Sequence, residues 1–420
     1  MNGIIKKLEK HDISSFVEIV VNAYPGFAQQ TEEFKERYKN SLIATQENIE
    51  SIDFFGLFRD GKLVGGMRIH HFTMNLYGRL ISAGGVGLVA VDLLHKKEKV
   101  AKQLMDYFLS YFKERGTSIV MLYPFRPDFY KQMGFGYGTN MNQYEISPSS
   151  FPKLKNKGRL LFLDSAHKKM VLSCANRYSS TTHGMLLKTE HDIGLMFKNP
   201  EHKLVGFMDN GKLEGYLLFT FKNVSKDNFL INNIIIKEFL YETPEALAQL
   251  CHFLHSQADQ INKVILNTQD DAIEYLISDP RNGSDHLIPS VYHETKKSGI
   301  GLMYKIIDIK VFFSQLPSEH FNGITCELGL IIHDSFQFVD PQKWLLTIEK
   351  GSLKIEEYAE NKPEIELEMD ISDFSSLLMG SISVNKLYQY GKLKITKNEC
   401  LNEVNKIFNR TPKPICTTAF

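Results

Sequence analysis

Apolar and polar residues alternate along the first 150 residues in a way that predicts helices and strands in turn. Residues 12–23 place apolar side chains on one face of a helix, with Asp12 or Ser14 as a suitable N-cap. Residues 53–58 and 62–72 read as two strands, and the sequence RDGK between them is typical of a hairpin turn.

The following segments predict a buried strand, a helix and a second buried strand. Residues 85–91 (GVGLVAV) are apolar throughout, and residues 97–113 repeat apolar side chains on one helical face. Residues 118–124 (SIVMLYP) form a continuous apolar run, which is typical of a strand covered on both faces. We therefore expect an α/β domain over residues 1–150.

A repeated segment and a change of pattern indicate two further domains. FRDGKLVGGMRI (58–69) recurs as MDNGKLEGYLLF (208–219), so residues 151–290 are predicted to be a diverged copy of the first domain. The copy lacks a basic turn and a Tyr-x-x-x-Gly-Phe segment, and we interpret it as a structural wall. From residue 291 short alternating strands predict a small α+β domain with an antiparallel sheet and Trp344 in its core.

Composition narrows the class of protein. A chain of 420 residues is long enough for two or three domains. Lys plus Arg and Asp plus Glu both total 49, so no net field favours nucleic acid or an anionic membrane. There is neither a signal-peptide pattern nor an apolar run long enough to span a membrane, and five scattered cysteines show no metal spacing. We expect a cytoplasmic protein without a metal site.

The run GVGLVAVDLLHKKEKVAKQLMDYFL (85–109) combines a buried strand, a basic turn and a helix. Helix-start amides and the positive end of the helix dipole bind a pyrophosphate, and Lys96, Lys97, Lys99 and Lys102 add positive charge there. Backbone groups at the end of the strand can pair with an amide-rich pantetheine arm. The run therefore predicts a coenzyme A site, and an ordinary basic surface turn is the alternative.

A second run, SIVMLYPFRPDFYKQMGFGYG (118–138), places Tyr130 on a short helix that ends at Gly134-Phe135. Together the two runs resemble the signature of the GNAT N-acetyltransferase superfamily, V-x-V-x-P-x-x-R/Q-x-x-G-x-G/A followed by F-Y-x-x-x-G-F. FYKQMGF matches the second part nearly letter for letter. Leu93 and Lys96 depart from the first part, and Lys99 replaces the glycine that lets the backbone approach the phosphate. The Lys99 side chain must therefore point away from the cofactor.

Over its whole length the chain resembles the enhanced intracellular survival family of bacterial acetyltransferases. MDISDFSSLLMGSISVNKLYQYGKLKI (369–395) carries the pattern of that family's C-terminal domain, which is similar to sterol carrier proteins. The resemblance implies an α/β (α+β) fold of tandem GNAT-like domains with mixed central sheets over 1–150 and 151–290, and a sterol-carrier-like α+β domain over 291–420. It also implies a hexamer.

The same resemblance implies the residues of the site. Donor contacts fall on the end of the buried strand, on the basic turn with the helix start, and on the loop before the short helix: Val89, Ala90, Val91, Lys97, Glu98, Lys99, Val100, Ala101, Lys102, Phe125 and Arg126. Tyr130 corresponds to the family's general acid. The family's chains end in Phe, whose free carboxylate is the base, and this chain ends in Phe420. Simple packing of Tyr130 and a frayed terminus are the alternatives.

These features predict an acetyl-CoA-dependent N-acetyltransferase that uses direct attack by the acceptor. The resemblance implies that the acceptor is a primary amine of a polycationic, aminoglycoside-like small molecule or of a protein lysine. Acetyl-CoA is the co-substrate, and no metal is required. The alternative is a non-catalytic protein that carries an apolar ligand in its C-terminal domain.

Overall fold

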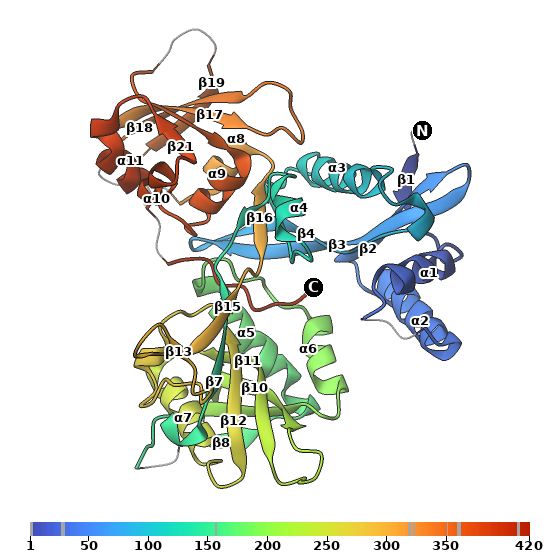
Figure 1. The fold of residues 1–420 in the computed structure, drawn as a ribbon, viewed down its shortest axis with the longest axis vertical. Coiled ribbons are helices and arrows are strands. Elements are labelled where there is room, and N and C mark those ends of the chain that lie inside the picture. The colour runs from blue at the N-terminus through green and yellow to red at the C-terminus, as the bar shows by residue number, and fades with distance from the viewer. Residues whose placement is uncertain are drawn as a thin grey trace. The chain divides into compact units, whose positions relative to one another are not determined.

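The computed structural model describes residues 3–26, 30–155, 158–317, 321, 324–350, 352–358, 363–409 and 412–420. The chain forms two compact units, each assembled from segments that are far apart in the sequence (Figure 1). The first unit comprises Met1–Gly138, Leu302–Lys413 and Ala419–Phe420, and the second comprises Thr139–Gly301 and Pro414–Thr418. The expected domain ranges with boundaries at 150 and 290 stay a prediction.

The first unit is built on a seven-stranded mixed sheet with the order β1-β2-β3-β4-β5-β16-β6. Strands β4 and β5 are parallel, whereas β16 pairs antiparallel with both β5 and β6. β16 follows the second unit in the sequence, yet it lies between β5 and β6 of this sheet. The strands are β1 (Ile4–Lys7), β2 (Ile52–Arg59), β3 (Lys62–Leu76), β4 (Arg79–Val91), β5 (Ile119–Leu122), β6 (Gly136–Tyr137) and β16 (Met303–Ile306).

Helices cover both faces of this sheet. Phe54 packs in the cluster formed by α1 (Ile13–Ala23) and α2 (Glu32–Asn48). Its neighbour Phe55 packs with α3 (Val100–Lys113) and α4 (Pro127–Lys131), because successive side chains of a strand point to opposite faces. The predicted helix at 12–23 and the predicted strands are confirmed, and the helix expected from residue 97 begins at Val100.

The second unit repeats this plan with a seven-stranded sheet in the order β15-β7-β12-β11-β10-β9-β8. Its hairpin turn has positive φ at Asn210 (47°) and Gly211 (79°), as the turn of the first unit has at Asp60 (48°) and Gly61 (74°). Two successive positive φ angles define the type I′ turn that suits a hairpin, so the repeat is structural. The elements are β7 (Met141–Ile146), β8 (Leu160–Phe162), α5 (Lys168–Thr181), α6 (Glu190–Lys198), β9 (Lys203–Asp209), β10 (Lys212–Asn223), β11 (Asn232–Tyr241), α7 (Pro244–His255), β12 (Ile261–Thr268), β13 (Leu287–Ile288), β14 (Tyr292–His293) and β15 (Lys296–Gly299).

The C-terminal part of the first unit forms a five-stranded sheet in the order β19-β18-β17-β20-β21. The prediction of an antiparallel sheet is wrong for one pair, because β17 and β20 run parallel. The β18–β19 hairpin extends the sheet on one side of β17, and the chain then crosses over to add β20 on the other side. Trp344 in β18 is buried, as predicted. The elements are α8 (Ile309–Gln315), β17 (Cys326–His333), β18 (Gln342–Glu349), β19 (Ser352–Glu357), β20 (Glu366–Asp370), α9 (Ile371–Leu378), α10 (Val384–Gln389), β21 (Leu393–Ile395) and α11 (Leu401–Phe408).

Candidate functional site

Strands β4 and β5 part from each other beside the predicted donor site. Their parallel register covers only residues 84–86 of β4 and 120–122 of β5. β5 ends at Leu122, whereas β4 continues to Val91 while paired with β3 on its other edge. The β4 edge from Gly87 to Val91 therefore has no β5 partner, and its backbone groups can bind an extended ligand that contains amides.

A bulge in β4 lies within this separated stretch. The register with β3 shifts there, and Leu88 has a φ of 53°, which is unusual for a residue with a side chain. The hydroxyl of Tyr24, at the end of α1, donates a hydrogen bond to the carbonyl oxygen of Val89 at 2.6 Å. Ala90 is buried toward α1, while the side chains of Val89 and Val91 pack on the α3 side. The bulge thus fixes how the predicted residues 89–91 present their backbone.

The basic turn leads into a helix start that no side chain caps. Lys99 is the N-cap of α3, and its side chain accepts no hydrogen bond from the first turn. The first amides of α3 are consequently available for an anion, and the adjacent lysines add positive charge. Lys97 and Lys99 have φ angles of 67° and 62°, in the left-handed region that favours glycine. Lys99 adopts the backbone conformation expected for a glycine, and its side chain is exposed.

This conformation makes a testable prediction about Lys99. Lys99→Gly should retain or raise stability, since about 1 kcal/mol of backbone strain is removed and part of it is offset by the freer unfolded chain. Lys99→Val should lower stability, because a β-branched residue tolerates a positive φ poorly. The melting temperature should therefore be lowest for Lys99→Val, and that of Lys99→Gly should equal or exceed that of the wild-type protein. A melting temperature for Lys99→Val at or above that of Lys99→Gly would contradict the strained backbone.

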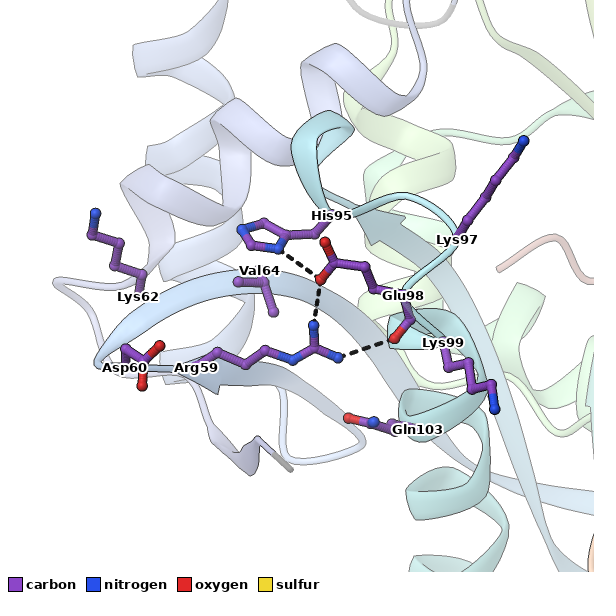
Figure 2. A pocket seen from close by; sticks show the side chains of 9 residues that line it. All are labelled: Arg59, Asp60, Lys62, Val64, His95, Lys97, Glu98, Lys99 and Gln103. Carbon is purple, nitrogen blue, oxygen red and sulfur yellow. Dashed lines mark hydrogen bonds and ion pairs between the residues drawn. The ribbon is translucent and has the colours of Figure 1, made fainter. Parts of the chain in front are cut away.

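Two cavities flank the turn. The larger, about 890 Å³, lies beside the β2–β3 hairpin and is lined by Asp60 and Glu98 among others (Figure 2). The carboxylate of Glu98 is held there by Arg59 Nη1 at 2.5 Å and His95 Nδ1 at 3.0 Å. The hydrogen bond from His95 is the main reason why the pKa of Glu98 is lowered. Glu98 therefore fixes the turn with its side chain, which leaves its backbone amide as the group able to meet a phosphate.

The smaller cavity, about 560 Å³, extends from Val91 past the turn and the start of α3 to α4. Its volume lies within the range of small-molecule sites, roughly 300–1,000 Å³. The predicted donor residues Lys97, Lys99, Val100, Ala101 and Lys102 all line it. Val100 itself is buried, whereas Ala101 is half-buried at the helix start.

The loop before α4 is more exposed than the rest of the predicted site. The Phe125 ring is largely exposed and lies 5.6 Å, centroid to centroid, from the ring of Tyr130. Arg126 is the N-cap residue of α4 and pairs with Asp128 at 2.5 Å on the surface. Exposed ion pairs of this kind are weak, about 0–1 kcal/mol, so Arg126 can exchange Asp128 for a ligand phosphate.

Tyr130 lies on α4 among the rings of Phe125, Phe129 and Phe135 and is 4% exposed. Burial is the main cause that raises the pKa of Tyr130, and the nearby Tyr24 raises it further. Tyr130 is thus a neutral hydroxyl that can donate a hydrogen bond but releases its proton with difficulty.

Phe420 is docked on the first sheet. Its ring centroid lies 4.9 Å from that of Phe72 and 5.2 Å from that of Tyr123. A methyl group placed on Gly85 would lie 3.1 Å from the Phe420 ring, and one on Gly87 would lie 3.5 Å from its carboxyl carbon. The terminus therefore covers the glycines at which β4 leaves β5. The frayed-terminus alternative does not describe this chain end.

Sequence reasoning missed two side chains, Arg68 beside this terminus and Tyr24 at the bulge of β4. A methyl group placed on Gly87 would lie 3.5 Å from Arg68 Nη2 and also 3.5 Å from the Phe420 carboxyl carbon, so both groups approach the same point. Desolvation lowers the pKa of Arg68 and, more strongly, that of the buried His70, which stacks on Phe72. The signal in the sequence was Gly85 and Gly87, which lie two apart and so leave one side of β4 open to another group.

The second unit lacks the features of a donor site at the corresponding helix. α7 begins at Pro244, and the side chain of its N-cap Thr243 accepts a hydrogen bond from the amide of Ala246. The C-terminal tail belongs to this unit just before Phe420, where Cys416 N–H donates to Gln269 Oε1 at 2.5 Å. The interpretation of the second copy as a structural wall stays a prediction.

The described residues contain no group of three His, Cys, Asp or Glu side chains that could hold a metal ion. Within the same residues, no helix is long and apolar enough to cross a membrane.

Comparison with protein families finds three matches along the chain. Residues 4–138 and 185–295 each match an acetyltransferase (GNAT) domain, and residues 309–417 match a sterol carrier protein domain. The predicted tandem GNAT-like domains and the sterol-carrier-like domain are thereby confirmed. No curated protein matches the chain.

Solved structures with the same fold cover the chain from end to end. A GCN5-related N-acetyltransferase from Anabaena variabilis superimposes with a TM-score of 0.81 at 18% identity, with 100% of both chains covered. A probable N-acyltransferase from Enterococcus faecalis gives 0.79 at 20% identity, again with 100% of both chains covered. Eis1 from Mycobacterium abscessus gives 0.77 at 15% identity over 100% of both chains. At these identities the likeness establishes the fold.

Proposed function

Because the chain is an acyltransferase, with two GNAT acetyltransferase domains and a sterol carrier protein domain, we propose that its first domain acetylates primary amines with acetyl-CoA. The observation that carries the proposal is the separation of β4 and β5 beside an uncapped, lysine-rich helix start. The acceptor class we propose is a polycationic, aminoglycoside-like molecule or a protein lysine. A hexameric assembly and a cytoplasmic location belong to the same proposal.

The residues present suit the parts of acetyl-CoA. The free β4 edge at residues 87–91 offers backbone groups to the amides of the pantetheine arm. The amides of α3 and the lysines of the turn suit the pyrophosphate. When bound, the donor would supply an acetyl thioester, and in this proposal its reactive end would face the residues around Gly87, Tyr130 and Phe420.

In this proposal Phe420 acts on the incoming amine. A lysine-like amine has a pKa of about 10.4, so it arrives as an ammonium and must lose a proton before attack. A terminal carboxylate has a reference pKa of about 3.3–3.7, which makes it a weak base. Its larger contribution is electrostatic, because it attracts the cation and stabilises the ammonium that forms during attack. Packing against Phe72 and Tyr123 would make it a stronger base, whereas the nearby Arg68 would make it a weaker one.

In the same proposal Tyr130 acts on the leaving group. Negative charge grows on the sulfur as the thioester bond breaks, and the neutral Tyr130 hydroxyl can donate a hydrogen bond to it. Since the pKa of Tyr130 is raised by burial, complete proton transfer to a thiolate with a pKa of about 8.5 is unfavourable. Hydrogen bonding is therefore the main part of its role as general acid.

The proposal is tested by incubating the protein with acetyl-CoA and a panel of polyamines, aminoglycosides and lysine peptides. Thiol release and a product mass increase of one acetyl group are the expected readouts. The alternative function, transport of an apolar ligand, predicts no product with any amine and binding of a fluorescent fatty acid. Failure of every amine to react, with a folded protein that binds coenzyme A, would contradict acetyl transfer to amines.

A variant in α3 tests the place of the donor. Ala101→Glu puts a carboxylate at the half-buried helix start, where it repels phosphate and competes for the free amides. We expect calorimetry to show coenzyme A binding weakened by about 100-fold or more, the order of a lost anion site with added repulsion. Ser110→Glu adds the same charge on the same helix, outside the cavity lining, and should bind normally. Equal affinity in both variants would remove the donor from this helix start.

A further inference from the structure

One wall of the 560 Å³ cavity comes from the C-terminal sheet. Ser335 and Phe336, which follow β17, line the cavity together with Lys102 of α3 and Gln132 and Met133 after α4. All of these residues belong to the first unit. The 560 Å³ cavity is therefore incomplete without the sterol-carrier-like domain.

Buried polar contacts hold this wall in place. Asp334 Oδ2 lies 2.8 Å from Lys305 Nζ, and both side chains are almost fully buried. Lys305 also donates to the carbonyl oxygen of Met133 at 2.9 Å, so it joins the end of α4 to Asp334. The backbone carbonyl of Asp334 accepts hydrogen bonds from the amides of Gln337 and Phe338. Breaking a buried ion pair is costly, so the segment is pre-organised before any ligand arrives.

Phe336 presents an aromatic surface next to the lysines. Its ring packs against the core that includes α3 and α4. Lys102 Nζ lies 5.3 Å from the ring centroid, within the distance of a cation–π contact. The contact holds the exposed Lys102 side chain at the cavity, where its charge can meet a phosphate.

The two cavities beside the turn differ in charge. Two carboxylates, those of Asp60 and Glu98, offset part of the positive charge of the larger cavity, which is also lined by Arg59, Lys62, Lys97 and Lys99. The described lining of the smaller cavity has Lys96, Lys97, Lys99 and Lys102 and contains no carboxylate. An anionic nucleotide is therefore favoured in the smaller cavity, which is also the one that reaches Val91 at the end of β4.

We propose that the C-terminal domain completes the donor site, with Phe336 contacting the adenine and Lys102 a phosphate of the adenosine end of coenzyme A. This inference rests on the proposed function. In the proposed function the acetyl end would lie near Tyr130 and the pyrophosphate at the start of α3, which leaves the rest of the smaller cavity for the adenosine portion. Phe336 lines that cavity next to Lys102.

The test compares three ligands: coenzyme A, dephospho-coenzyme A and pantetheine. In Phe336→Ala we expect calorimetry to show about 10-fold weaker binding of the first two, the order found when one stacking aromatic ring is removed. Turnover with S-acetylpantetheine, which has no adenosine, should be unchanged. Phe336→Leu keeps apolar packing and removes only the aromatic face, so it should show the same pattern if Phe336→Ala folds poorly. Phe338→Ala, whose ring contacts Lys113 outside the cavity lining, is the matched control.

The lysines distinguish the two cavities. Lys102→Gln should weaken coenzyme A binding, while Lys62→Gln, in the larger cavity, should leave it unchanged. Normal coenzyme A affinity in a folded Phe336→Leu variant, or a loss confined to Lys62→Gln, would overturn the inference and leave the acetyltransferase function standing. A wild-type protein that binds no coenzyme A would instead contradict the proposed function itself.

Discussion

Moving the C-terminal carboxylate is expected to lower amine acetylation by about 100-fold or more, within the range known for loss of a positioned acid or base. A short tag after Phe420 moves the charge by about 3.3–3.6 Å for each extended residue. It also disturbs a ring that packs between Phe72 and Tyr123, directly over Gly85. Deletion of Phe420 removes both the ring and the properly placed charge. Steady-state rates with saturating acetyl-CoA measure the effect.

Two controls separate chemistry from folding in this experiment. The helix start of α3 is untouched by either change, so coenzyme A affinity should stay within a few-fold of the parent. An N-terminal tag should leave the rate unchanged, and the melting temperatures of all samples should agree. A well-folded C-terminally tagged protein with the parental rate would show that Phe420 is not the base, and an internal carboxylate or a water relay would take its place.

Tyr130→Phe is expected to lower turnover by about 10²–10⁴-fold, the usual contribution of a positioned acid. The substitution keeps the ring that packs with Phe125, Phe129 and Phe135 and removes only the hydroxyl. Fold and donor binding should therefore survive. Tyr137→Phe, on β6, is the matched control because it removes a hydroxyl from a nearby tyrosine that has no role in the proposed chemistry.

The pH dependence gives an independent check of Tyr130. Burial raises its pKa above the ordinary value of about 10. The neutral form is present below the folded pKa, so the wild-type rate should show no loss from Tyr130 ionisation up to about pH 10. Wild-type turnover in Tyr130→Phe would return Tyr130 to a packing role. A decline of the wild-type rate near neutral pH that vanishes in Tyr130→Phe would contradict the raised pKa.

The sequence by itself determined the local elements of the first domain and their order. Period-2 and period-3.6 patterns are properties of adjacent residues, so the hairpin strands, the buried strand and α3 were predictable. The segment FYKQMGF fixed the short helix with Tyr130 for the same reason, and the repeated GKL turn identified the second GNAT domain. The start of α3 was placed three residues too early. Lys97 and Lys99 adopt the left-handed backbone conformation that usually marks a glycine, and a lysine in the sequence does not indicate that conformation.

Only the tertiary structure decided which distant segments meet. It inserted β16 between β5 and β6, made β20 parallel to β17, and placed Arg68 and Tyr24 at the separated strands. It also laid the Phe420 ring over Gly85 and brought Phe336 to the donor cavity. These contacts join residues that lie tens to hundreds of positions apart. Their formation depends on how whole sheets and helices pack, which no local periodicity records.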